Sequence, residues 1–294
     1  MSRTRAYLAL AAAISGTAWS AILVRWAGVP GTSAGLYRTL IAALVLVPWR
    51  LAHRQTPAPR GAAVALALAG GAFFALDLAL YNTAVLLTTA ATAALLGNLT
   101  PIFVGLMTWI FVRRPPRTAF WMGLALSIAG CAAIVGSDAL HGGDARNLFG
   151  DQLALFAAVF FAGYLVMTER VRTSMDTLTF NTLAIIGSVV TLLVICLLRH
   201  DALAGFPPKA WAALVALGLV SQLGAYLALV YALGHLPATI TSAGLLAQVP
   251  LTAILAMIFL QEPLSLAQIA GGIVVLAGIY VVNRAEGRRM ELGE

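Results

Sequence analysis

The chain has 294 residues, of which 61% are hydrophobic and 10% are charged, and its mean hydropathy is +0.93. These values lie far outside the usual range of soluble proteins, so the lipid bilayer must be the main solvent of the chain. A membrane-spanning helix needs about 20 mostly apolar residues, which leaves room for about ten spans and for no soluble domain. The net charge of +7 comes from small basic clusters at the ends of apolar runs, which excludes a nucleic-acid-binding tract.

Apolar runs separated by charges, prolines and glycines predict ten helices. The first run follows Arg3 and Arg5 as in a signal peptide, but it continues past Trp19 and nine more runs follow, so we expect it to be retained. The expected fold class is an all-α polytopic membrane protein with about ten transmembrane helices. The predicted spans are 6–28, 33–51, 61–83, 88–111, 117–137, 150–171, 177–198, 209–234, 238–260 and 265–284.

Basic residues predict the orientation of these spans. If the N-terminus is cytoplasmic, most of the 18 Lys and Arg residues fall in cytoplasmic segments, as the positive-inside rule predicts. Only Arg146, Arg199 and Lys209 then lie in outer segments, with Arg25 and Arg38 near the outer ends of the first two spans. We expect a multi-pass protein of the bacterial inner membrane with both termini in the cytoplasm.

Two halves of the chain resemble each other. The segment that ends at Pro101 aligns without a gap with the segment that ends at Pro250, and Gly130 falls over Gly278 after one residue of slippage. Because five helices per unit is an odd number, the second copy has the opposite membrane orientation. We expect two inverted five-helix repeats around a central cavity, over residues 1–140 and 147–287.

Pro101 and Pro250 occupy equivalent positions in the middle of the fourth and ninth predicted spans. A proline inside a helix removes a backbone donor and clashes with the preceding turn, so both helices should be kinked. Asn98 and Gln248 stand beside the two prolines. We therefore interpret Pro101 and Pro250 as hinges that line a cavity.

Glycines seven residues apart mark the fifth and tenth spans. Gly123 and Gly130 share one helix face, as do Gly271 and Gly278, and each pair permits the close approach of another backbone. We expect these two helices to be scaffold.

Asp77 lies deep inside the third span, where exposure to lipid would cost about 2.5 kcal/mol or more. Phe73, Asp77 and Tyr81 recur every four residues and so share one face. In the repeat alignment Gln222 falls over Phe73, and Tyr226 falls over Asp77. Such a face suits a solute with an amine and an apolar body.

Other mid-span polar and aromatic side chains are expected to complete a central pocket. Asp77 is the candidate for proton coupling, although proton exchange and facilitated diffusion both remain open. Arg38 either extends to the outer surface or pairs with an interior acid. The predicted substrate-binding residues are Trp19, Phe73, Asp77, Tyr81, Asn98, Tyr164, Ser221, Gln222, Tyr226, Ser242 and Gln248.

Other functional classes fit less well. No hydrolase, nucleotide-binding or metal-binding motif is present, so no catalytic residue, metal or cofactor is predicted. The polar residues are too sparse for the water path of a channel. A sugar-phosphate carrier would need Lys or Arg in its pocket, where only Arg38 is near. The expected partners are a small-molecule substrate and the lipid bilayer, with no nucleic acid and with a monomer as the working unit.

The order of these features resembles the drug/metabolite transporter superfamily, in particular its ten-helix EamA-type exporters, over essentially the whole chain. Trp19-Ser20, Tyr37-Arg38, the Pro101 helix and the stretch from Pro250 to Tyr280, which contains Glu262, carry the resemblance. Arg113-Arg114 depart from it, because the family usually has an acidic residue there.

The resemblance implies a secondary transporter that exports amino acids or related metabolites by alternating access. The overall pattern is most similar to that of exporters of aromatic amino acids. Export of other metabolites, organic cations or drugs remains the alternative.

Overall fold

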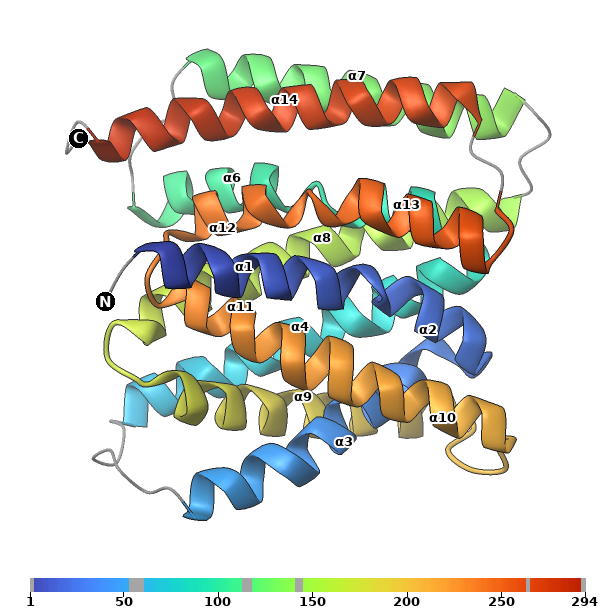
Figure 1. The fold of residues 1–294 in the computed structure, drawn as a ribbon, viewed down its shortest axis with the longest axis vertical. Helices are drawn as coiled ribbons and strands as arrows, with labels where there is room; N and C mark the ends of the chain where they lie inside the picture. The colour runs from blue at the N-terminus through green and yellow to red at the C-terminus, as the bar shows by residue number, and fades with distance from the viewer. Residues whose placement is uncertain (1–2, 53–60, 113–117, 141–144, 263–264, 292–294) are drawn as a thin grey trace.

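The computed structural model describes residues 3–52, 61–112, 118–140, 145–262 and 265–291, and every element in these ranges is a helix. The ten successive predicted spans run alternately in opposite directions, and both termini lie at one end of the bundle (Figure 1). We call this end the terminal end and the opposite end the far end. The prediction of a polytopic helical membrane protein is confirmed. The elements are α1 (Arg3–Ala18), α2 (Ser20–Ala27), α3 (Gly31–Ala52), α4 (Gly61–Leu87), α5 (Ala90–Gly97), α6 (Thr100–Val112), α7 (Thr118–Leu140), α8 (Ala145–Arg172), α9 (Thr177–Arg199), α10 (Pro208–Ala216), η1 (Leu217–Ala225), α11 (Tyr226–Leu233), α12 (Ala238–Leu245), α13 (Gln248–Phe259) and α14 (Leu266–Glu291).

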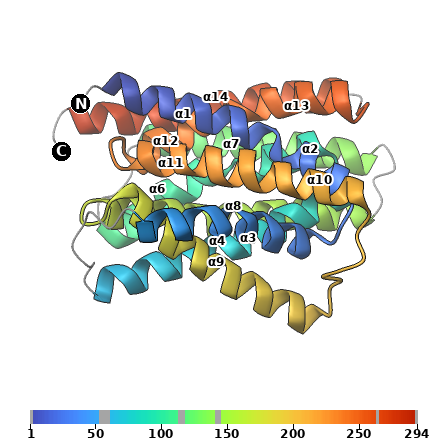
Figure 2. The same ribbon diagram turned by 60° about the horizontal axis from the view of Figure 1, so that its bottom comes forward.

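Each predicted span corresponds to one helix or to a run of consecutive helices. Seven segments of the described chain are long and apolar enough to cross a membrane. Three shorter apolar helices, at 121–130, 248–259 and 266–278, lie within the remaining predicted spans. In Figure 1 the α7–α14 pair lies on the opposite side of the bundle from α9 and α3, and Figure 2 also shows α14 and α9 at opposite edges.

The fourth and ninth spans are interrupted just before their prolines, as predicted. α5 ends at Gly97 and α6 begins at Thr100, while α12 ends at Leu245 and α13 begins at Gln248. The carbonyl of Gly97, which Pro101 deprives of a backbone donor, accepts a 2.9 Å hydrogen bond from Thr100 Oγ1. A local side chain thus compensates for the missing helical bond.

Two further departures from regular α-helix occur in spans where no proline indicates them. The first span is interrupted at Trp19, between α1 and α2, and the eighth contains the π-helix η1. Ser221 Oγ of η1 donates to the Gly16 carbonyl at 2.8 Å, and Thr252 Oγ1 donates to the Ala18 carbonyl at 3.2 Å. The first span is therefore held at its interruption by helices of the second half of the chain. Single π-helical turns frequently occur at functional sites.

α7 and α14 pack along each other at the edge of the bundle (Figure 1). A Cβ placed on Gly278 would lie 2.6 Å from the Gly123 carbonyl oxygen, and one placed on Gly130 would lie 2.8 Å from the Gly271 carbonyl oxygen. The close backbone approach predicted from the glycine spacing is confirmed.

Candidate functional site

A polar cavity of about 50 Å³ lies between the two halves of the chain. One probe sphere occupies about 10–15 Å³, so the space holds a few water molecules and no complete amino acid. Its lining comes from seven of the ten predicted spans. The lining residues are Thr17, Ser20, Arg38, Asp77, Leu78, Tyr81, Gly97, Asn98, Phe161, Tyr226 and Gln248.

The structure brings some of the predicted binding residues together and places others in the surrounding packing. Asp77, Tyr81, Asn98, Tyr226 and Gln248 line the cavity. The remaining six are absent from its lining. Trp19 packs on Phe259, Phe73 packs on Phe160, Tyr164 packs on Phe74, Ser221 bonds to Gly16, and Gln222 and Ser242 are buried.

Arg38 is the charged lining residue that was not among the predicted binding residues. It is 1% exposed, so it does not extend to the surface, and its Nη1 donates to Ser20 Oγ at 2.9 Å. Its guanidinium lies 5.8 Å from the ring centroid of Tyr226. It interacts electrostatically with Asp77, which is also buried. The cavity therefore holds a basic and an acidic side chain, and their opposite charges, when both groups are ionised, partly offset the cost of burying either one.

The sequence did indicate that Arg38 could have a functional role. A charged residue inside an apolar run is by default a candidate functional residue in a membrane protein. Its position near a predicted helix end made surface exposure equally reasonable, and only the packing of α3 resolves the choice. Thr17, Ser20, Leu78, Gly97 and Phe161 gave no comparable signal, because small polar and apolar residues are common in every span.

The two proline-interrupted helices meet at the cavity. Gln248 Nε2 donates to Asn98 Oδ1 at 2.6 Å, and Asn98 Nδ2 donates to the Ala94 carbonyl at 2.6 Å. The side chains at the two interruptions are thus bonded to each other across the repeat interface. A change in the bend of either helix must alter this contact.

An ion pair joins the two halves of the chain at the far end. Arg25 at the end of α2 pairs with Glu262, with 2.9 Å between Nη1 and Oε1. The second carboxylate oxygen of Glu262 accepts from the backbone N–H of Ala90 at 2.9 Å, at the N-terminus of α5. Arg25 also donates to the carbonyls of Val85 and Thr88 at the end of α4. We call Arg25, Glu262 and these three backbone groups the far-end latch.

A larger groove of about 1120 Å³ opens at the terminal end, beside Glu169 and Arg170. It lies between α4, α6 and α8. On α4, Leu66 and Ala69 line the groove and share a helix face with Phe73 and Asp77. Phe73 therefore stands between the groove and the cavity along this face, where it packs on α8.

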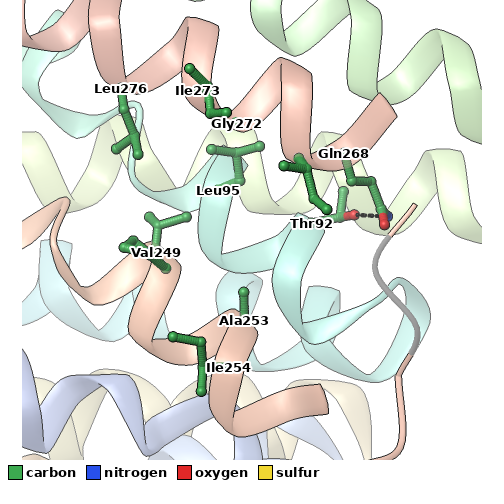
Figure 3. Close-up of a pocket in the computed structure, with 11 residues that line it drawn as sticks. Thr92, Leu95, Val249, Ala253, Ile254, Gln268, Gly272, Ile273 and Leu276 are labelled. Atoms are coloured by element: carbon green, nitrogen blue, oxygen red, sulfur yellow. Dashed lines mark hydrogen bonds between the residues drawn. The ribbon is translucent and has the colours of Figure 1, made fainter. Parts of the chain in front are cut away.

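A separate pocket of about 240 Å³ lies between α5, α13 and α14 (Figure 3). Leu95, Val249 and Ile273 are among its lining residues, and its polar contact is the bond of 3.0 Å from Gln268 Nε2 to Thr92 Oγ1. This pocket has no charged lining residue. The central cavity is therefore the better candidate for binding a polar solute.

Comparisons with known proteins agree with this architecture. The EamA-like transporter family matches the chain twice, over residues 4–136 and 148–284. A transporter of Archaeoglobus fulgidus is 29% identical, with 96% of this chain and 98% of that protein covered. A probable terminal-alkyne amino-acid exporter of Streptantibioticus cattleyicolor is 28% identical, with 90% and 87% covered. The pseudopaline exporter CntI of Pseudomonas aeruginosa is 26% identical, with 88% of each chain covered.

A solved crystal structure has the same fold. It superposes with a TM-score of 0.68 over 96% of this chain and 98% of the other chain, at 20% sequence identity. Two matched regions, each holding five predicted spans, account for nearly all of the sequence. The chain therefore belongs to the EamA-like transporter family of the drug/metabolite transporter superfamily.

Proposed function

We propose that this transporter exports small metabolites of the amino-acid class, with aromatic and other neutral amino acids preferred, from the cytoplasm across the bacterial inner membrane. The observation that carries the proposal is a central cavity, lined by both repeats, that holds the buried side chains of Arg38 and Asp77. Relatives named as an amino-acid exporter and as a pseudopaline exporter support the export of amino-acid-like molecules.

Aromatic rings around the charged pair support the preference for aromatic side chains. Tyr81, Phe161 and Tyr226 line the cavity, and Phe161 and Tyr226 have ring centroids 6.3 Å apart in an edge-to-face arrangement. Stacked and edge-to-face contacts favour another aromatic ring in such a site.

The cavity must enlarge to admit a complete amino acid. The interruptions of the fourth and ninth spans, at Pro101 and Pro250, are the elements that can change their bend without breaking regular helix. Since the Asn98–Gln248 contact joins them, the two helices would move together.

Access from the two ends differs. The far-end latch joins the two halves at the far end, whereas the groove between α4, α6 and α8 lies at the terminal end. With both termini in the cytoplasm, a substrate would load through this groove, and export would require the latch to open. Alternating access follows if opening one end excludes opening the other.

The proposal is tested with purified protein in liposomes. Labelled phenylalanine should enter in exchange for unlabelled phenylalanine, faster than in empty liposomes and with saturation. A panel of amino acids, organic cations and sugar phosphates then separates the substrate classes. If no amino acid is transported above the background, the proposal is wrong. Transport of organic cations alone would support the alternative function, the export of organic cations, because Asp77 and the nearby rings also suit a cation.

A further inference from the structure

We propose that Arg38 and Asp77 together recognise the zwitterionic head group of an α-amino acid, with the guanidinium on the substrate carboxylate and the Asp77 carboxylate on the substrate ammonium. The inference rests on the proposed function and deepens it. It predicts that a molecule with only one of the two charged groups is a poor substrate.

Arg38 has donor capacity to spare in the cavity. Its Nη1 bonds to Ser20, but its Nε, although buried, has no hydrogen-bond partner within the part of the chain that the structure describes. The guanidinium lies over the Tyr226 ring, and a guanidinium that faces a ring can still use the N–H groups at its edge to bind a planar acceptor. A carboxylate is such an acceptor, because its two oxygens match two parallel guanidinium N–H groups.

Charge balance favours a substrate with both charges. Without a substrate, Arg38 and Asp77 interact electrostatically with each other. An amino acid would give each of the two side chains a partner of opposite charge and would bring no net charge into the interior. An amine would bind Asp77 and leave Arg38 without a counter-charge. An N-acylated amino acid would bind Arg38 and leave Asp77 without one. An isolated buried charge is strongly unfavourable.

The size of the site agrees with this assignment. Arg38 and Asp77 line the same small cavity, so a solute bound there would have both charged side chains in its surroundings. The aromatic rings of Phe161 and Tyr226 belong to the same lining and would contact the side chain after the cavity widens. The head group and the side chain of the substrate would then be recognised by different residues.

The experiment compares three molecules with the same apolar body: phenylalanine, phenethylamine and N-acetylphenylalanine. Each competes with labelled phenylalanine for exchange in proteoliposomes, and each is also tested for binding to the detergent-solubilised protein by thermal shift. For the wild type we expect phenylalanine to compete about tenfold better than either analogue. Arg38→Gln should lose the preference over phenethylamine, and Asp77→Asn should lose the preference over N-acetylphenylalanine.

Arg199→Gln is the matched control, because Arg199 is exposed at the far end and pairs locally with Asp201; its preferences should equal those of the wild type. The double variant Arg38→Gln/Asp77→Asn keeps the cavity neutral and tests recognition if a single variant fails to fold. It should bind the three molecules within about twofold of one another.

The outcomes separate the two proposals. If the wild type exchanges phenylalanine but all three molecules compete equally, the zwitterion proposal is wrong and amino-acid export stands. The zwitterion proposal is also wrong if the double variant Arg38→Gln/Asp77→Asn keeps the tenfold preference for phenylalanine over the two analogues. If phenethylamine is transported and phenylalanine is not, the proposed function itself is wrong.

Discussion

Gln248 Nε2 and Asn98 Oδ1 are joined by a hydrogen bond of 2.6 Å that links the interrupted helices of the two repeats beside the central cavity. Both residues lie within a few positions of the prolines that interrupt their helices. The contact therefore couples the two elements whose bending can change the size of the cavity. Such coupling is a physical basis for coordinated movement of the two halves.

Replacement of Asn98 and Gln248 tests this coupling. Asn98→Ala and Gln248→Ala should each destabilise the protein, since each leaves the remaining buried or partly buried amide without its partner. In a double-mutant cycle followed by chemical unfolding, we expect a coupling energy of about 0.6 kcal/mol, as for other polar contacts between membrane helices. Additive effects of the two substitutions would show that the contact is not an energetic link.

The far-end latch gives a prediction about access to the cavity. Glu262→Gln retains an oxygen for the Ala90 N–H but loses the ion pair with Arg25, so the far end should open more often. A cysteine at Thr17, which lines the cavity, should then react faster with a membrane-impermeant thiol reagent applied at the far end.

Two controls accompany this measurement. The chain's own Cys131 and Cys196 are replaced in every variant, so that only the introduced cysteine reacts. Asp201→Asn breaks a local ion pair of Arg199 at the same end and should leave the labelling rate unchanged. Equal labelling rates in Glu262→Gln and the parent protein would mean that the ion pair does not hold the far end closed.

Two glycines of α14 should differ in their tolerance of a side chain. Gly278→Ala would place a Cβ 2.6 Å from the Gly123 carbonyl oxygen, whereas a Cβ at Gly272 has no neighbour within 4 Å. We expect Gly278→Ala to lower the free energy of unfolding by about 1–3 kcal/mol, and Gly272→Ala to leave it unchanged or to raise it. Thermal unfolding in detergent compares the two, and equal effects would contradict the observed packing of α7 against α14.

Asp77 is the acidic side chain of the cavity lining, so we expect it to carry the proton if export is proton-coupled. Asp77→Asn should then abolish the response of phenylalanine uptake to an imposed pH gradient, while exchange without a gradient remains measurable. Asp201→Asn at the far end serves as the control and should respond as the wild type does. An unchanged response in Asp77→Asn would assign Asp77 to substrate binding alone.

The sequence predicts the helices of this protein well, because a bilayer demands long apolar segments and prolines interrupt them locally. The interruption at Trp19 was not predictable, since the hydrogen bonds that accompany it come from Ser221 and Thr252, more than 200 positions away along the chain. Tyr164 likewise packs on Phe74 rather than lining the cavity. The periodicity of a helix predicts on which side of the helix a residue lies, but not which residues of other helices pack against it.

The central claim is that the solute passes through the cavity between the two repeats. Exchange of labelled phenylalanine in proteoliposomes tests it most directly when the wild type is compared with Thr17→Trp, which fills the cavity, and with Phe156→Trp, which adds bulk at an exposed position of α8. We predict saturable exchange in the wild type and in Phe156→Trp, and none above empty liposomes in a folded Thr17→Trp. Undiminished exchange in Thr17→Trp would contradict the account.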